Sequence, residues 1–306
     1  MSNSQSPHTF LPQAFFEGKF IPFVDAKISV ATHAFQYGTG AFGGLRGSVD
    51  STTGRVKLFR LDRHADRLSR SAKYFGYDIE PEFIRSKIIE FVQINQPKGD
   101  FYIRPMIYSS SLGIGPATHN VDKDFLIYGL SMGDYLNPKG VSCRFSSWIR
   151  QEDSSVPLRG KITGSYTMAS MAKSEAVNSG FDEALIFNSK GKICEASAMN
   201  LFVVRSGQLI TPSVDQDILE GITRDSIIIL AKHLNIPVVE RAVDKTEILI
   251  ADEVFLTGTA GKITCVNRIE NHILPESKPI FDQLKNALDQ VYNQQISGFE
   301  SWITIV

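Results

Sequence analysis

Residues 38–59 read GTGAFGGLRGSVDSTTGRVKLF, and this stretch decides between a doubly wound α/β fold and another mixed fold of helices and strands. Its first six residues match the pattern G-x-G-x-x-G, which in dinucleotide-binding proteins joins a strand to a helix. Here Gly44 follows at once, and Asp50–Gly54 has the composition of a turn before the strand-like Val56–Phe59. The stretch therefore predicts strand, turn and strand, which argues against a nicotinamide site. Its glycines favour a backbone that closely approaches a ligand or another subunit.

Apolar spacing predicts the other helices and strands. Apolar residues at 61, 65, 68, 72 and 75 are three or four apart, which predicts a helix over Arg60–Tyr77 with one buried face. Pro81 is typical of a helix start and predicts a second helix. Further helices are expected over Thr223–Leu234 and Ile280–Tyr292, and strands over Phe101–Ser109, Asp124–Ser131, Val141–Ile149, Glu183–Phe187, Leu201–Val204, Pro237–Glu240 and Glu253–Leu256. Since strands and helices do not alternate regularly, the expected class is α+β and not a doubly wound sheet.

The chain's 306 residues exceed what one compact core usually holds, so two domains are expected. The run GDYLNPKG at Gly133–Gly140 combines glycine, asparagine and proline between two strand-like segments, as linkers do. We therefore predict a smaller N-terminal α/β domain over residues 1–133, a linker over 134–140, and a larger, β-rich C-terminal domain over 141–306.

Composition and charge exclude several classes of function. With 42% hydrophobic residues, 21% charged residues and a net charge of −1, the chain has no expected surface for nucleic acids or anionic membranes. Cys143, Cys194 and Cys265 form no CxxC pair or Cys/His cluster, so no metal site is expected and a reducing compartment is favoured. Residues 1–12 lack the pattern of a secretory signal, and no run of about 18 apolar residues could span a membrane. We expect a cytoplasmic protein with a loose N-terminal tail.

Four groups of segments, in order along most of the chain, carry a resemblance to a known family. They are HAFQYGTGAFGGLR at 33–46; FRLDRHADRL at 59–68 with YIRP at 102–105; KITGSY at 161–166 with EASAMNLF at 195–202; and LEGITRD at 219–225 with TGTA at 257–260. Together they resemble the fold-type IV enzymes that use pyridoxal 5'-phosphate (PLP), and the branched-chain aminotransferases most closely. The resemblance implies a two-domain fold that holds the cofactor between its domains.

The resemblance assigns the cofactor's reactive atoms to three residues. Lys161 matches the lysine that forms the Schiff base with PLP and moves protons during transamination. Tyr166 matches the tyrosine that hydrogen-bonds the cofactor's phenolate oxygen. Glu195 matches the carboxylate beside the pyridine nitrogen, which must stay protonated for the ring to withdraw electrons. The position of a lysine alone could not single out Lys161, because the chain has many lysines.

Phosphate binding needs positive charge and backbone N–H donors. Gly221–Thr223 opens the predicted helix to Leu234, and a helix start supplies both N–H groups and a favourable dipole. The resemblance places the phosphate there, with the cofactor-binding residues Leu219, Gly221, Ile222, Thr223 and Thr259. It adds Arg67 from the N-terminal domain, and arginine suits two-point contact with phosphate.

The resemblance further implies that the amino group moves between branched-chain L-amino acids (leucine, isoleucine, valine) and 2-oxoglutarate by a ping-pong mechanism. One pocket must then accept both an apolar side chain and a carboxylate. The implied substrate-binding residues are Tyr37, Phe42, Tyr102, Arg104, Ile114, Thr259 and Ala260, with Tyr166 also in the pocket wall. Arg104 and Tyr37 would meet the distal carboxylate of glutamate, and Tyr102 with the amides of 259 and 260 would hold the α-carboxylate. Some of these groups come from a neighbouring subunit in the family, which implies at least a homodimer.

The sequence departs from the family pattern at two places and leaves alternatives open. Gly43 stands where the family commonly has glutamate, and Ala198–Met199 where it often has glycine and glutamate; both changes remove a charge near the expected substrate. D-amino-acid aminotransferases and 4-amino-4-deoxychorismate lyases share the lysine, the glutamate and the phosphate site. Only segments 33–46 and 102–105 favour the branched-chain type over them. A nicotinamide-dependent oxidoreductase would depend on the glycine pattern alone.

Overall fold

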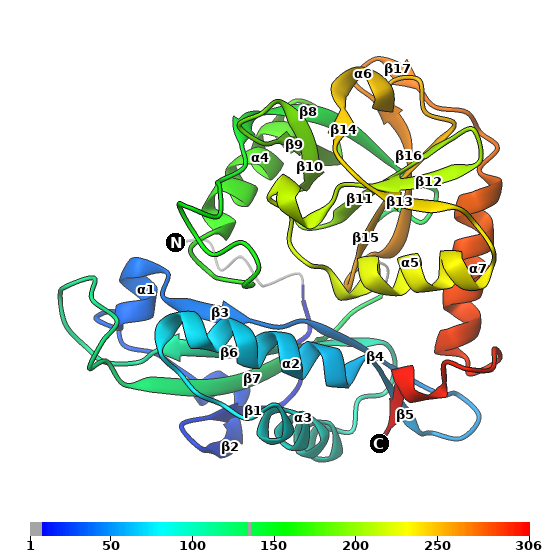
Figure 1. Cartoon of the computed structure of the whole chain (residues 1–306). Helices are drawn as coiled ribbons and strands as arrows, with labels where there is room; N and C mark the ends of the chain where they lie inside the picture. The colour runs from blue at the N-terminus through cyan, green and yellow to red at the C-terminus, as the bar shows by residue number, and fades with distance from the viewer. Residues whose placement is uncertain (1–7, 134–135) are drawn as a thin grey trace. The chain divides into compact units, whose positions relative to one another are not determined.

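The computed structural model describes residues 8–133 and 136–306, which form two compact units (Figure 1). Within these ranges, the first unit contains residues 8–133, 160–164 and 299–306, and the second contains residues 136–159 and 165–298. The predicted tail residues 1–7 and the first two residues of the predicted linker, Asp134 and Tyr135, lie outside the described residues.

Two short segments depart from the predicted domain boundaries. Residues 160–164 and 299–306 fall in the predicted C-terminal domain, yet they pack within the first unit. Lys161 O accepts a hydrogen bond from Phe42 N at 2.9 Å, and β18 (Ile303–Ile305) pairs with β5 (Val56–Phe59). Lys161, which the sequence placed in the C-terminal domain, thus packs in the first unit, and such pairing between distant segments leaves no local signal in a sequence.

The first unit is built on an antiparallel sheet with the strand order β18-β5-β4-β6-β7-β1-β2, and β3 pairs with β6. Its other strands and its helices are β1 (Gln13–Phe16), β2 (Lys19–Pro22), β3 (Gly40–Phe42), β4 (Leu45–Val49), β6 (Phe101–Ser109), β7 (Lys123–Ser131), α1 (His33–Tyr37), α2 (Leu61–Ala72) and α3 (Pro81–Asn95). Helices α2 and α3 pack beside each other on the sheet (Figure 1). The core between them and the strands includes Leu61, Leu68, Ile84, Ile88 and Phe91.

Alternation along β6 divides its side chains between the two faces of the sheet. Phe101, Ile103 and Ile107 belong to the core under α2 and α3. The intervening positions, Tyr102 and Arg104 among them, therefore face the opposite side. The register of β3 against β6 pairs residue 42 with residue 106, which places the Phe42 ring on that same side.

The second unit is built on a mixed sheet with the strand order β13-β12-β11-β15-β16-β8-β9-β10-β14. A further pairing of β10 with β11 closes part of this sheet on itself, and β17 pairs with β16. The elements are β8 (Val141–Ile149), β9 (Glu183–Phe187), β10 (Lys192–Ala196), β11 (Asn200–Arg205), β12 (Gln208–Thr211), β13 (Val238–Glu240), β14 (Val243–Asp244), β15 (Glu253–Gly258), β16 (Lys262–Ile269), β17 (His272–Ile273), α4 (Tyr166–Asn178), α5 (Ile222–His233), α6 (Lys245–Ile248) and α7 (Pro279–Tyr292). The core inside the sheet is aliphatic and includes Leu185, Leu201, Val203, Leu256 and Val266.

The predicted α+β class and the predicted strand–turn–strand over 38–59 are confirmed. The predicted helix Arg60–Tyr77 is shorter than expected, because α2 ends at Ala72 and a 3-10 turn, Lys73–Phe75, leads into Gly76 with a φ of 67°. Only glycine adopts such a φ without steric cost. Over residues 8–133 and 136–306, no helix combines the length and the apolar character needed to cross a membrane.

Candidate active site

Lys161 lies on a short segment that pairs with the edge of β3. Lys161 O accepts the hydrogen bond from Phe42 N, and Thr163 N donates to Gly40 O at 2.9 Å. The side chain of Thr163 adds a hydrogen bond to Gly38 O at 2.6 Å. The backbone from Lys161 to Thr163 is thus fixed to the sheet of the first unit.

Glycines make this pairing possible. Gly38 has a φ of 65°, and a Cβ added to it would lie 2.7 Å from the Cα of Gly164. A Cβ added at Gly40 would lie 2.8 Å from Ile107 O. The sequence led us to expect that the glycine-rich stretch approaches a ligand or another subunit; at these two positions it approaches other segments of its own unit.

Ser71 links Lys161 to the predicted phosphate arginine. Lys161 N donates to Ser71 Oγ at 3.2 Å, and Ser71 Oγ donates to Arg67 O at 2.8 Å. Arg67 is 7% exposed, whereas Arg63 and Arg70 on the same helix are exposed. Arg67 is therefore buried, unlike its two exposed neighbours. Its main-chain carbonyl is connected through the Ser71 hydroxyl to the main-chain amide of Lys161.

His64 is a member of this cluster that the sequence did not single out. It is buried, and burial together with the nearby cations of Arg67, Lys161 and Arg60 lowers the pKa of its imidazole well below the usual range. The three cations create a positive potential that the neutral histidine does not change. This potential favours the binding of an anion such as a phosphate. Its spacing from Arg67, one helical turn earlier, is the signal that could have identified it.

Three predicted substrate residues come together on the open face of β3 and β6. Arg104 Nη2 donates to the Tyr102 hydroxyl at 3.2 Å, and its Cζ lies 4.5 Å from the centroid of the Phe42 ring. Lys161 Nζ lies 4.9 Å from the same centroid. A Cβ at Gly44 would lie 1.9 Å from the Tyr102 hydroxyl, so this hydroxyl occupies the space that a side chain would fill.

Tyr37 and Ile114 form a separate group in the first unit. Gly115 N donates to the Tyr37 hydroxyl at 3.0 Å, which ties the loop after β6 to α1. Ile114 on this loop is 96% exposed. Its side chain points into solvent in the single chain, unlike the three residues beside Lys161.

The second unit holds Glu195 in a buried polar network. Arg150 Nη2 lies 2.9 Å from Glu195 Oε1, and both side chains are less than 9% exposed. Glu195 Oε2 accepts hydrogen bonds from Asn200 Nδ2 at 2.9 Å and from Leu219 N at 3.1 Å. Burial, and then the charge of Glu195, raise the pKa of the adjacent Cys194, so this cysteine stays a neutral thiol. Arg150 and Asn200 were not predicted as site residues.

The network leads directly to the start of α5. Asn200 Nδ2 also donates to Leu219 O at 2.9 Å, and a Cβ at Gly221 would lie 1.9 Å from Asn200 Oδ1. The first intrahelical hydrogen bond runs from Asp225 N to Gly221 O. The amides of Ile222 and Thr223 precede it, as the first N–H groups of a helix do, and can therefore donate to an anion.

The remaining predicted residues of the second unit lie at element ends. Tyr166 is the first residue of α4 and is partly buried. Thr259 and Ala260 occupy the partly exposed turn between β15 and β16. Met199, one of the departures from the family pattern, is 5% exposed under this turn: a Cβ at Gly258 would lie 3.1 Å from its Cγ, and one at Gly261 would lie 2.9 Å from its Cε.

These residues fit the cofactor that the resemblance implies. The first unit presents the amine of Lys161 and the buried guanidinium of Arg67, whose charges both act on His64, and the second presents a buried carboxylate and the start of a twelve-residue helix. The carboxylate suits the pyridine nitrogen of the cofactor, which must stay protonated. The cation and the helix amides suit its phosphate. Thr257, opposite Asn200 in the β11–β15 pairing, adds a buried hydroxyl that has no hydrogen-bond partner among the described residues.

Comparisons with known proteins agree with this chemistry. The sequence model of the amino-transferase class IV family matches residues 47–269. A probable branched-chain-amino-acid aminotransferase from Synechocystis is 59% identical, and the match covers 97% of each chain. The crystal structure of a branched-chain aminotransferase from Thermoproteus uzoniensis with norvaline has a TM-score of 0.93 at 33% identity and covers 97% of this chain and 99% of that one. A branched-chain amino acid aminotransferase from Thermobaculum terrenum, solved in its PLP-form, has a TM-score of 0.90 at 30% identity and covers 97% and 98%.

Proposed function

Because the chain belongs to the class IV aminotransferase family, we propose that it is a PLP-dependent enzyme that moves the amino group between branched-chain L-amino acids and 2-oxoglutarate. The observation that carries the proposal is the fixed position of Lys161, whose amine lies over Phe42 and whose amide is joined through Ser71 to Arg67. The relatives named as branched-chain aminotransferases support the substrate class.

Each predicted cofactor residue has its own task in this proposal. Bound PLP supplies an electron sink that makes the α-proton of an amino acid acidic. Lys161 would hold the cofactor and its amine would move this proton, and Tyr166 would donate to the phenolate oxygen. Glu195 would keep a proton on the ring nitrogen, while Arg67, Thr259 and the first amides of α5 would bind the phosphate.

The substrate pocket combines an apolar wall with one cation. The rings of Phe42 and Tyr102 suit a leucine side chain, and Arg104 lies against both of them to receive the distal carboxylate of 2-oxoglutarate. Tyr102 and the amides of Thr259 and Ala260 hold the α-carboxylate. Gly43 packs against Pro105, since a Cβ there would lie 2.9 Å from Pro105 Cγ. Gly43 thus packs closely where the family commonly has glutamate, and one negative charge fewer lies near the expected substrate.

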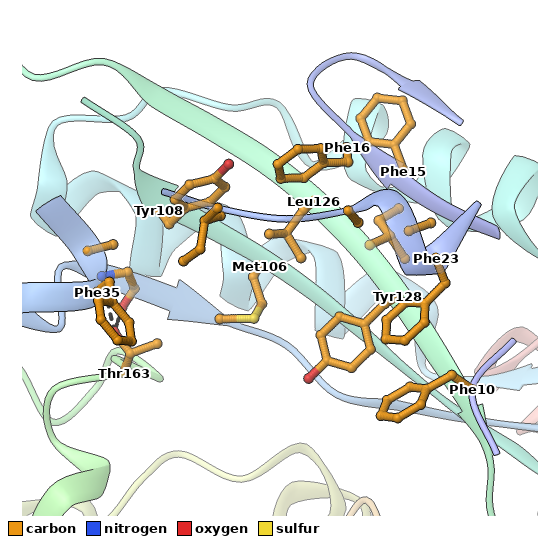
Figure 2. Close-up of a pocket in the computed structure, with 16 residues that line it drawn as sticks. Phe10, Phe15, Phe16, Phe23, Phe35, Met106, Tyr108, Leu126, Tyr128 and Thr163 are labelled. Atoms are coloured by element: carbon orange, nitrogen blue, oxygen red, sulfur yellow. Dashed lines mark hydrogen bonds between the residues drawn. The ribbon is translucent and has the colours of Figure 1, made fainter. Parts of the chain in front are cut away.

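We further propose that the enzyme is a cytoplasmic homo-oligomer. The first unit exposes Val30 (85%), Phe35 (69%), Leu112 (64%) and Ile114 (96%), and such apolar surfaces commonly mark contacts between proteins. A cavity of about 430 Å³ adjoins Phe35, and Figure 2 shows that aromatic and aliphatic side chains line it. The resemblance implies that some substrate-binding groups come from a neighbouring subunit, and a second copy covering this surface would supply Tyr37 and Ile114. The buried, free cysteines fit a reducing compartment.

The substrate proposal is tested with purified enzyme and one amino donor at a time. L-leucine, L-isoleucine and L-valine should each bleach the visible band of the bound cofactor, and 2-oxoglutarate should restore it. D-alanine should leave the band unchanged. Bleaching by D-alanine alone would assign the enzyme to the D-amino-acid type instead.

Lys161→Ala tests the cofactor lysine. Borohydride reduction of the wild-type enzyme should fix the cofactor to the peptide that contains residue 161, as read by mass spectrometry. The variant should show no such label and no turnover. Lys98→Ala, which removes an exposed lysine of the first unit, is the control and should behave as wild type. Labelling at another lysine in the wild-type enzyme would disprove the assignment.

A further inference from the structure

We propose that Arg150 is a positioning residue for the reaction: it holds Glu195 as an oriented anion and thereby keeps the proton on the ring nitrogen of the cofactor. The proposal rests on the proposed function, because it concerns the carboxylate assigned to that nitrogen. Arg150 itself touches Glu195 and acts through it.

The guanidinium of Arg150 is fixed on several sides. Arg150 follows β8 directly, and its main-chain N donates to Phe187 O at 2.8 Å. Its Nε donates to Asp217 O at 3.0 Å, and its Nη2 lies 2.9 Å from Glu195 Oε1. The side chain is 8% exposed, so contacts with protein groups, and not with water, determine its position.

The two oxygens of Glu195 face different partners. Oε1 meets the cation of Arg150, while Oε2 accepts two neutral N–H groups, one from Asn200 and one from Leu219. These contacts fix the plane of the carboxylate. A protonated ring nitrogen is a proton donor that such an oriented carboxylate would meet.

The charge of Arg150 determines whether the proton between Glu195 and the ring nitrogen stays on the nitrogen. Burial alone favours a neutral carboxyl group, whereas a cation within about 4–6 Å favours the carboxylate by 1–3 pKa units. The ion pair with Arg150 therefore favours the charged form of Glu195, which leaves the proton on the ring. Without Arg150, a buried carboxylate would lack its counter-charge and would take up the proton itself. The ring would then be a poorer electron sink.

The test compares Arg150→Met and Arg150→Lys with wild type, using PLP labelled with nitrogen-15 in the ring. The nitrogen chemical shift, followed against pH, reports protonation of the ring independently of turnover. In Arg150→Met the midpoint of this titration should fall by about one pH unit or more, and Arg150→Lys should fall between that variant and wild type. Equilibrium dialysis should show weaker PLP binding by Arg150→Met.

Arg144→Met is the matched control. Arg144 lies on β8, the strand that Arg150 directly follows, and it pairs with a glutamate, Glu175, at 3.8 Å, but outside the Glu195 network. This variant should keep the wild-type nitrogen titration. A shift as large as that of Arg150→Met would show that loss of a paired arginine outside the Glu195 network has the same effect, and would overturn the proposal.

A double variant separates a role through Glu195 from a general effect on folding. Glu195→Gln should lower the midpoint by itself, and adding Arg150→Met to it should lower the midpoint no further. Additive shifts, or a wild-type titration in Arg150→Met, would disprove the positioning role. Failure of the wild-type protein to bind PLP would instead refute the proposed function, so the two failures are distinguishable. If Arg150→Met does not fold, as judged by circular dichroism, Arg150→Lys carries the same comparison.

Discussion

At the scale of single residues, His64 must remain neutral in the folded chain. Its pKa is lowered first by burial and then by Arg67, Lys161 and Arg60, so it lies below the ordinary value of about 6.5. As the pH falls below about 6.5, the unfolded chain binds a proton that the folded chain excludes. Stability from this residue is therefore complete above that pH and is lost progressively below it.

His64→Gln should remove this pH dependence. Between pH 8 and pH 5.5 the wild-type protein should lose about 1.4 kcal/mol more of its free energy of unfolding than the variant does. Urea unfolding of both proteins at the two pH values measures the difference, and groups common to both cancel. Equal losses in the two proteins would show that His64 is protonated in the fold as easily as in the unfolded chain.

Gly44 decides where the Tyr102 hydroxyl can lie. In Gly44→Ala the new Cβ would overlap that hydroxyl, which must move away from its contact with Arg104. We expect the KM for L-leucine to rise roughly tenfold, because one hydrogen bond to the charged carboxylate is lost, while PLP affinity stays unchanged. Gly99→Ala is the control, since a Cβ there meets nothing within 4 Å. A fall in PLP affinity without a change in KM would contradict the role of Tyr102.

At the scale of elements, the start of α5 is shaped by the side chain beneath it. A Cβ in Gly221→Ala would overlap Asn200 Oδ1 and displace the first turn of the helix, together with the amides of Ile222 and Thr223. We expect PLP affinity to fall roughly tenfold, because these amides would no longer meet the phosphate. Isothermal calorimetry with PLP measures the loss. Ile229→Ala, on the exposed face of the same helix, should bind PLP as wild type does, and an equal loss there would attribute the effect to the stability of α5.

Elements with a strong local pattern could be predicted from the sequence, and those without one could not. Strands 101–109, 141–149 and 183–187 begin and end where their β-branched and aromatic residues predict. Helix α4 was missed because its sequence, YTMASMAKSEAVN, consists largely of small and polar residues and shows no wide apolar stripe. The same limit applies to the site: the contact between Arg150 and Glu195 joins residues far apart in sequence, so no spacing rule reveals it.

The resemblance singled out site residues that local sequence patterns could not identify, but it gave no geometry for their roles. It selected Lys161 and Arg67 among many cations, and the structure adds the hydrogen-bond chain through Ser71 that connects them. It marked Met199 only as a departure from the family. The structure gives this side chain a contact with both glycines of the turn that holds Thr259 and Ala260. The apolar Met199, which stands where the family often has glutamate, is therefore explained by its packing under that turn.

At the scale of the whole molecule, residues 299–306 pack in the first unit, far in sequence from most of its other residues. Val306 exchanges main-chain hydrogen bonds with Val56, and Trp302 O accepts one from Arg60 N at 2.7 Å. The guanidinium of Arg60 lies 4.3 Å from the Trp302 ring, and Phe299 and Ile303 are 7% exposed. The segment thus protects the edge of β5 and buries apolar surface against it.

Deletion of residues 299–306 should therefore destabilise the first unit more than the second. Loss of two buried apolar side chains alone corresponds to about 3–6 kcal/mol, and an edge of β5 would be left open to other chains. Hydrogen exchange should show faster exchange in β4 and β5 of the truncated protein and unchanged protection in β11 and β15 of the second unit. Ile305→Ser, which changes a half-exposed residue of the same segment, should leave β5 protected. Equal loss of protection in both units would mean that they unfold as one cooperative body, whereas no loss in β5 would mean that the terminal strand contributes nothing to the unit it joins.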